Sequence, residues 1–179
     1  HYCYRAVMTR CFGYYFNQPL GNSLNKLSSL THVNFEHDFN QPLGNFLCNL
    51  LSLTHIGLGY NFNQKENLPF NIRTIRLNNN NTVIVDYLPD SIEEIELGMD
   101  FNFELDNLPS AIKKIMFGKY SKYNKKLNCL PSQLSILQLP DMYEQQISSI
   151  PKALSKVICS KNYPHIGDFS GIEVNTYPY

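Results

Sequence analysis

The sequence contains little charge and no excess of either sign. Charged residues make up 17% of the 179 residues, with 15 basic and 15 acidic side chains, whereas about a quarter is usual. A neutral protein has no long-range field that would draw in nucleic acid. No apolar run approaches the ~18 residues that span a bilayer. We therefore expect neither a nucleic-acid partner nor a membrane partner.

Cysteine is sparse and follows no pattern. The five cysteines are widely spaced and form no CxxC pair, so they predict neither a zinc site nor a disulfide framework. Reduced thiols are typical of a cytoplasmic protein, and we expect a cytoplasmic location. A disulfide between Cys3 and Cys11 is the alternative.

The motifs of common catalytic sites are also absent. The sequence contains no GxSxG, P-loop or HExxH motif and no Cys/His dyad, which are the arrangements that supply nucleophiles, phosphate cradles or metals. His32 and His55 hold the same place in two successive repeats and could share a metal or act as a pH switch. Only Glu36 and His37 lie nearby as further ligands, so polar surface is the favoured interpretation. We expect no enzyme, cofactor, metal or small-molecule substrate.

Internal repetition is the strongest feature that is present. The string Phe-Asn-Gln-Pro-Leu-Gly-Asn occurs at residues 16–22 and again at 39–45, and Phe-Asn-Gln starts a third copy at 62–64. Residues 30–35 and 53–58 repeat at the same offset of 23. Beyond residue 62 the residues change, but the pattern apolar-x-x-apolar-x-apolar continues at steps of 19 to 22. Its seven central positions are Val33, Ile56, Ile75, Ile95, Ile115, Leu137 and Val157.

Two further sequence signals recur with the same spacing as the strand pattern. A proline stands three residues before the apolar residue that opens each later strand pattern, as Pro89 does before Ile92. Proline has no N–H to give to a ladder, so it suits the outer side of a coil. In the other signal, Asn81 holds one slot, and an aromatic residue holds the others, at Phe16, Phe39, Phe62, Phe101, Tyr123 and Tyr143. The Asn after most of them, at positions 17, 40, 63, 102 and 124, predicts a ladder of buried Asn side chains bonded to backbone groups.

A period of about 20–29 residues with this alternation is typical of a leucine-rich repeat. One short strand cannot bury its apolar face alone, but stacked parallel strands share a continuous core. We therefore expect an α/β leucine-rich-repeat solenoid, a right-handed curved stack of about seven coils with a concave parallel β-sheet. Short helices are predicted on the convex side at 20–30 and 43–50, with 3₁₀ or extended segments in the later coils. The aromatic residues should form a stacked spine in the core.

The ends of the chain depart from the repeat. Residues 1–15 read as a partial N-terminal coil or cap, in which Phe12 matches Phe35 at the offset of 23. Residues 16–160 hold the repeats. Apolar residues between Tyr163 and Val174 break the period, so residues 161–179 are predicted to fold over the last coil as a cap.

The residues between the apolar positions of each strand predict the binding surface. Charges on this surface should lie side by side on successive coils: Arg73 with Glu93 and Lys113, Glu94 with Lys114, and Arg76 with Glu96. Lateral salt bridges and a polar docking patch both explain this order, and both can hold at once. The partner-binding residues predicted on the concave face are His32, Asn34, His55, Thr74, Arg76, Glu94, Glu96, Lys114, Met116 and Gln138.

The FNQPL string, the Leu-Pro segments and the strand pattern that follows them resemble the FNIP repeat, a leucine-rich-repeat variant of social amoebae and giant viruses of amoebae. The resemblance covers roughly residues 10 to 160. Copies from residue 81 onward are degenerate, because Asn81, Phe103 and Glu144 depart from the FNQP string. Those copies are also similar to the Leu-Pro repeats of secreted bacterial effectors, which implies the same fold.

The resemblance implies a function as well. FNIP arrays often follow an F-box, which docks to the adaptor of a cullin-type ubiquitin ligase, so the repeats would select the substrate. The residues before residue 10 are too few to form an F-box. We expect a protein-protein interaction scaffold, with substrate recognition in the ubiquitin pathway as the role that the family implies. The alternative is a structural or assembly repeat protein, such as a component of a viral particle, with no ligase role. If the chain is viral, the expected cytoplasmic location is the cytoplasm of the host.

Overall fold

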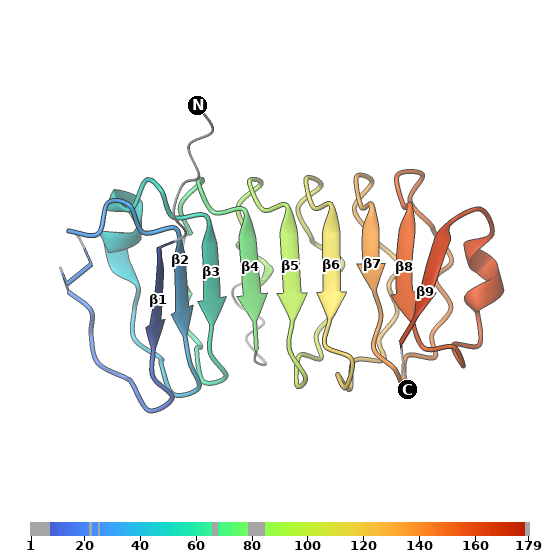
Figure 1. Cartoon of the computed structure of the whole chain (residues 1–179), viewed down its shortest axis with the longest axis horizontal. Coiled ribbons are helices and arrows are strands. Elements are labelled where there is room, and N and C mark those ends of the chain that lie inside the picture. The colour runs from blue at the N-terminus through green and yellow to red at the C-terminus, as the bar shows by residue number, and fades with distance from the viewer. Residues whose placement is uncertain (1–7, 22, 25, 66–67, 79–84, 178–179) are drawn as a thin grey trace.

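The structure is a computed structural model that describes residues 8–21, 23–24, 26–65, 68–78 and 85–177. These residues form one parallel sheet of nine strands, whose spatial order is their order in the chain (Figure 1). Each strand is thus followed by a return segment that leads to its neighbour, as a solenoid requires. The strands are β1 (Thr9–Phe12), β2 (His32–Phe35), β3 (His55–Leu58), β4 (Thr74–Leu77), β5 (Glu94–Leu97), β6 (Lys114–Phe117), β7 (Ile136–Gln138), β8 (Lys156–Cys159) and β9 (Glu173–Thr176).

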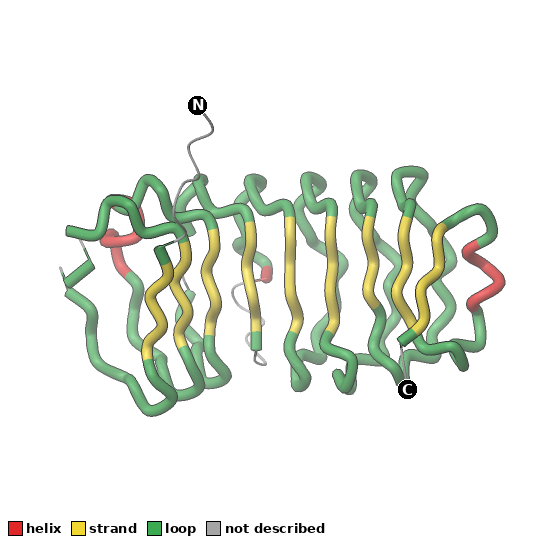
Figure 2. Tube along the Cα trace, in the orientation of Figure 1, coloured by secondary structure: helices red, strands yellow, loops and turns green. Residues whose placement is uncertain are grey.

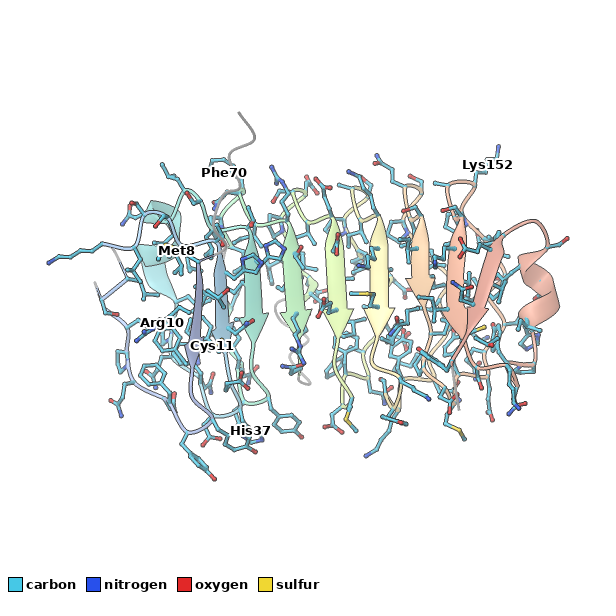
Figure 3. All side chains as sticks on the ribbon, in the orientation of Figure 1. Met8, Arg10, Cys11, His37, Phe70 and Lys152 are labelled. Atoms are coloured by element: carbon cyan, nitrogen blue, oxygen red, sulfur yellow. The ribbon has the colours of Figure 1, made fainter. Side chains whose placement is uncertain are left out.

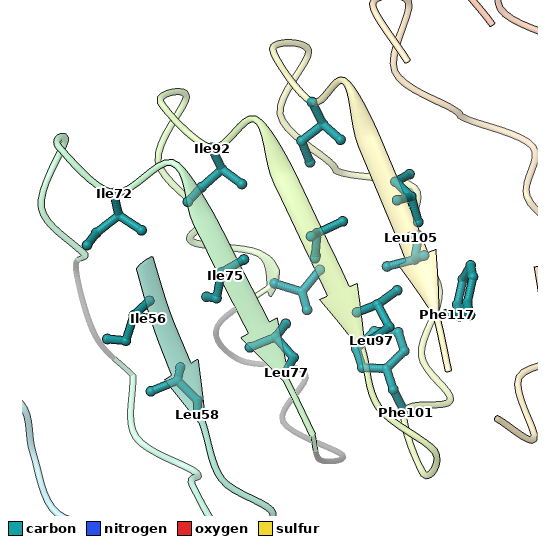
Figure 4. Packing of buried hydrophobic residues seen from close by; sticks show 14 of the residues in the cluster. Ile56, Leu58, Ile72, Ile75, Leu77, Ile92, Leu97, Phe101, Leu105 and Phe117 are labelled. Atoms are coloured by element: carbon teal, nitrogen blue, oxygen red, sulfur yellow. The ribbon is translucent and has the colours of Figure 1, made fainter. Parts of the chain in front are cut away.

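The strands form because alternate residues in each are apolar and become buried together. In β5, Ile95 and Leu97 are 0% and 2% exposed, while Glu94 and Glu96 are partly exposed. Ile95 lies in register between Ile75 on β4 and Ile115 on β6. Figure 4 shows Ile56, Ile75 and other buried hydrophobic side chains beside one another across neighbouring strands. The leucine-rich-repeat solenoid expected from the pattern is confirmed.

The sheet has two more strands than the seven repeats of the pattern. At the N-terminal end, β1 pairs with β2 so that Phe12 stands opposite Phe35, as the 23-residue offset predicted. At the C-terminal end, β9 pairs with β8 and sets Val174 opposite Val157 after a step of only 17 residues. Residues 173–176 therefore extend the sheet as a ninth strand. The domain boundaries proposed from the sequence stay predictions.

The return segments contain very little helix (Figure 2). The helix expected at 43–50 is the 3₁₀ helix η1 (Gly44–Asn49), and a second 3₁₀ helix, η2 (Ile166–Phe169), precedes β9. The described residues between 20 and 30 instead form turns, in which the Leu27 amide donates a hydrogen bond to the Leu24 carbonyl at 2.9 Å, so the helix expected there is wrong for them. No described helix is long and apolar enough to cross a membrane.

The prolines of the later coils close a turn just before each strand. The carbonyl oxygen of Pro89 accepts a hydrogen bond from the Ile92 amide at 3.0 Å, and Pro69, Pro109, Pro131 and Pro151 accept the equivalent bond. The first residue of such a turn contributes only its carbonyl to the closing bond, so the missing N–H of proline costs nothing there. The recurring Leu-Pro is therefore a turn signal that brings the chain back to the sheet.

The aromatic residues form the predicted spine. Phe39 stacks on Phe16 and on Phe62 with ring centroids 5.9 and 6.1 Å apart. In the later coils Tyr143 stacks on Tyr123 at 6.4 Å and contacts Tyr163 at 5.8 Å. Phe39, Phe62, Phe101, Tyr123 and Tyr143 are all at most 1% exposed. A stacked ring therefore continues the core past the carboxyl ends of the strands in two groups of coils, from Phe16 to Phe62 and from Phe101 to Tyr163.

The asparagine ladder exists, but its side chains are not buried. Asn17 Oδ1 accepts the amide of Asn40 at 2.9 Å, and Asn40 Oδ1 accepts the amide of Asn63 at 2.8 Å. Asn124 makes the same bond to the amide of Glu144 at 2.9 Å. Asn17, Asn63 and Asn124 are nevertheless exposed and Asn40 is half-buried. The expectation of burial was wrong because the aromatic ring fills the core and its neighbour in the chain turns outward.

The cysteines behave as separate thiols where they are described. Cys159 is 0% exposed at a core position of β8, and burial raises the pKa of its thiol. Cys11, Cys48 and Cys129 are exposed and free. Cys3, and with it the alternative disulfide to Cys11, lies outside the described residues.

One hydroxyl in the spine leads to a stability prediction. Tyr143 and Tyr163 donate their hydroxyl hydrogen to the carbonyls of Lys125 and Gln145 at 3.1 and 2.7 Å, whereas the buried Tyr123 hydroxyl has no partner among the described residues. Tyr123→Phe should raise the free energy of unfolding by about 1 kcal/mol, because an unsatisfied buried hydroxyl is removed, and Tyr143→Phe should lower it by a similar amount. Urea unfolding followed by circular dichroism compares the two variants. Equal losses in both would contradict the assignment of Tyr123 as unsatisfied.

Candidate functional site

The ten predicted binding residues lie on one face of the sheet. This exposed face has two rows, which follow from the strand register. None of the ten residues is buried. The first row contains His32, His55, Thr74, Glu94 and Lys114, and the second row, nearer the carboxyl ends of the strands, contains Asn34, Arg76, Glu96, Met116 and Gln138. Their places are as predicted, and their role in binding stays a prediction.

Most charges on and beside this face are paired between neighbouring coils. Lys114 Nζ lies 3.3 Å from Glu94 Oε2, and Glu93 lies between Lys113 at 2.8 Å and Arg73 at 3.8 Å. The ammonium of Lys113, which donates to the Glu93 carboxylate, lowers the pKa of that carboxyl. These pairs confirm the lateral arrangement predicted from the sequence. Such exposed pairs contribute only about 0–1 kcal/mol each to stability, so they affect the charge pattern of the face more than the stability of the array.

The expected pair of Arg76 and Glu96 takes a different form. The two residues stand opposite each other on β4 and β5, but the Arg76 guanidinium donates to Asn78 Oδ1 at 3.2 Å. A guanidinium binds whichever acceptor meets its planar geometry, and Asn78 follows Arg76 by two residues in the same coil. The carboxylate of Glu96 has no ion-pair partner within the described part of the chain.

A groove of about 480 Å³ opens beside the second row, at the carboxyl ends of the strands. This volume falls in the range of small binding sites in proteins. Four predicted residues line it, namely Arg76, Glu96, Met116 and Gln138, whereas the other six lie elsewhere on the face. Sequence reasoning named Glu36 and His37 only as possible metal ligands and did not predict the other lining residues, which are Tyr14, Tyr60, Asn78, Leu97, Gly98, Met99, Asp100, Phe117 and Gly118.

Three of the lining residues form a row of stacked rings. His37 stacks between Tyr14 and Tyr60, with ring centroids 4.5 and 5.0 Å apart and planes inclined by 12° and 7°. Figure 3 shows His37 beyond the carboxyl ends of the strands. His37 Nδ1 lies 2.7 Å from Asp38 Oδ1, which fixes the ring. The signal was present in the sequence, since positions 14, 37 and 60 are 23 residues apart.

Glycine makes room where the coils approach most closely at this edge. A Cβ on Gly98 would stand 2.8 Å from Asn78 Cα, and one on Gly59 would stand 1.7 Å from the Glu36 carbonyl oxygen. No side chain fits at such distances, so both positions require glycine for space. The floor of the groove beside Gly98 is therefore backbone, and the walls are side chains from neighbouring coils.

The two histidines of the first row are in contact. His32 and His55 stack with ring centroids 3.8 Å apart, and each Nδ1 lies 2.8 Å from the Oγ1 of the preceding threonine, Thr31 or Thr54. Burial and then the neighbouring His55 lower the pKa of His32. Among the described residues no group of three or more His, Cys, Asp or Glu side chains could hold a metal ion.

Comparison with known proteins assigns part of this chain to a repeat family. Residues 79–120 match the FNIP Repeat family model. The segment includes β5 and β6, so the FNIP resemblance is confirmed in the copies that depart most from the FNQPL string. No curated protein matches the chain.

A solved structure supports the fold of the whole array. The chain is similar to CroV588, a giant-virus protein described as a novel circular LRR protein, with a TM-score of 0.61 and 21% sequence identity. The match covers 87% of this chain and 28% of CroV588. The chain thus spans little more than a quarter of that protein, and at this identity the likeness extends to the fold.

The FNIP segment contains a pair that tests whether the face is open. Exchanging the charges in Glu94→Lys with Lys114→Glu should change the free energy of unfolding by less than about 1 kcal/mol, because an exposed ion pair is restored in reverse. Glu94→Lys alone should cost more, since it sets two ammonium groups side by side. Urea unfolding provides the measurement. A loss above about 2 kcal/mol in the double variant would show that this face is buried.

The histidine stack predicts a dependence of stability on pH. Since the pKa of folded His32 is below its ordinary value of 6.5, the unfolded chain binds the proton first as the pH falls. Stability should therefore be constant above that value and decrease as the pH falls from 6.5 through the lowered pKa. Unfolding in urea at pH 7.5 and 5.5 measures the loss, which should be smaller in His32→Gln. In the control variant His165→Gln it should equal that of the parent chain.

Proposed function

We propose that this chain is a protein-interaction scaffold that binds a partner protein across the exposed face of its sheet and the adjoining groove. The observation that carries the proposal is the groove itself. It joins residues from coils far apart in the sequence, from Tyr14 to Gln138, into one surface of mixed charged, aromatic and methionine side chains. Surfaces of this composition are typical of protein interfaces.

The size of the face is adequate for a partner. Nine parallel strands at ~4.8 Å give eight gaps and a strip of roughly 38 Å, and four residues of strand add a height of roughly 13 Å. The groove and its rim of exposed side chains, including Tyr60 and Met99 at 40% and 54% exposure, enlarge this strip. Together they approach the ~800 Å² per partner of a standard interface.

The family resemblance supports a finer proposal. In FNIP-repeat proteins that carry an F-box, the repeats would present substrates for ubiquitylation, and this chain would do so in the cytoplasm. The proposal includes no catalysis, cofactor or small-molecule substrate, because the sequence carries none of the motifs that such chemistry uses.

A second candidate function is assembly. CroV588 is described as circular, and a repeat array that closes into a ring or stacks end to end would be a structural component with no ligase role. In that case the edges of the sheet, rather than its face, would make the contacts. Sedimentation velocity distinguishes the two, since an assembly protein forms concentration-dependent oligomers.

A charge-matched pair of variants tests the binding proposal. Glu96→Lys with Met116→Lys changes the centre of the face, and Asp106→Lys with Gln133→Lys makes the same change of charge on exposed return segments. Cross-linking followed by mass spectrometry, in lysate of cells that express the chain, should show partner proteins linked to the parent and to the return-segment variant. The face variant should lose them at least tenfold, because charge reversal in a desolvated interface is costly. Equal loss or equal retention in both variants, with unchanged thermal melts, would overturn the proposal.

A further inference from the structure

We propose that the groove along the carboxyl ends of β1 to β7 binds a cationic side chain, an arginine or a lysine, of the partner protein beside Glu96 and Asp100. The inference rests on the proposed function and names the chemistry that the scaffold selects. It follows from the charge balance of the groove, from the side chains that form its walls and from the contrast with the paired charges elsewhere on the face.

The groove has more acidic than basic groups, although the whole chain is neutral. Its lining contains three carboxylates, those of Glu36, Glu96 and Asp100, against one guanidinium, that of Arg76. Arg76 is already held by Asn78 at 3.2 Å. Asp100 has a distant partner, Lys122, whose Nζ lies 3.8 Å away on a side chain that is 81% exposed.

Two of the three carboxylates have no counterion in the described part of the chain. Neither Glu36 nor Glu96 takes part in an ion pair there. The neighbouring Glu94 and Glu93 each pair with a lysine from the next coil. The position after Glu96 along the second row holds Met116, so the lateral neighbour that would supply an ammonium is missing. The groove therefore contains two carboxylates that the described residues of the neighbouring coils do not neutralise.

The uncharged walls fit the rest of such a side chain. Tyr60 at the end of the ring stack and Met99 are 40% and 54% exposed, and Met116 lies between them and Gln138 in the lining. Arginine and lysine bury their aliphatic stems along apolar surface while the charged group meets an acceptor. Aromatic faces attract the same cations, and thioether side chains adapt to irregular shapes.

The same charges disfavour other occupants. A nucleic-acid phosphate or an acidic peptide would bring negative charge against Glu36, Glu96 and Asp100, which costs free energy in a partly desolvated groove. A purely apolar segment would leave those carboxylates without water or a counterion. A basic side chain beside Glu96 and Asp100 would meet carboxylate acceptors with its charged group and the uncharged wall with its stem.

Small probes test the inference on the intact chain. Nuclear magnetic resonance of the ¹⁵N-labelled protein is titrated with Nα-acetyl-arginine methylamide and with its neutral isostere, Nα-acetyl-citrulline methylamide. The lysine and norleucine derivatives form the second matched pair. The amide signals of Gly98, Met99 and Met116 should shift with the cationic probes, which should bind at least about fivefold more tightly than the neutral ones. The difference should shrink as salt is raised, because screening weakens the attraction.

Two variants assign the effect to the groove. Glu96→Gln should abolish the preference for the cationic probe, whereas Asp106→Asn, which removes the same charge from the return segment of the same coil, should keep it. Equal binding of cation and isostere, shifts only outside the groove, no shifts at all, or equal loss in both variants would overturn the inference. Loss of partners in the charge-reversed face variant would still support the proposed function, so the two failures are distinguishable.

Discussion

The structure depends on one constraint, which is that each coil must place its central apolar residue directly opposite that of the coil before it. Ile56, Ile75, Ile95 and Ile115 form such a row in register, each at most 2% exposed. A strand with four residues buries too little apolar surface to be stable alone. Its stability is therefore a property of two adjacent coils. A strand cannot shift its register by one residue, because that shift would turn every apolar side chain to solvent.

The same register arranges the opposite face without further contacts. Because Ile75, Ile95 and Ile115 are aligned, the residues between them must also form straight rows, and like residues from equivalent positions are brought together. The imidazoles of His32 and His55 stack for this reason, as do the rings of Tyr14, His37 and Tyr60 beyond the strand ends. Glu93 and Lys113, at equivalent positions of adjacent coils, carry opposite charges, because like charges there would repel.

The groove arises where this order is incomplete. Gly98 and Gly118 leave backbone in place of side chains, Met116 stands where an ammonium would have completed a pair with Glu96, and Arg76 turns to Asn78. Most charged side chains of the face pair with a residue of a neighbouring coil, but Glu36 and Glu96 in the groove do not within the described part of the chain. Unsatisfied carboxylates beside exposed rings favour an external cation, which connects the packing of the array to the chemistry proposed for its partner.

The sequence alone was sufficient for the core and for the assignment of residues to faces. The 23-residue and shorter offsets are local information, and the alternation around Ile95 is visible in six residues, so the parallel register, the aromatic spine and the ten residues of the face could be predicted. The ninth strand, the exposed position of Asn17 and its equivalents, the Arg76–Asn78 bond and the groove could not. Each of these depends on how side chains from several coils divide a limited space, and that competition is resolved only when the coils are stacked. Repetition in the sequence determined which residues lie beside one another, and the tertiary structure decided which of these neighbours form bonds and which leave carboxylates unpaired.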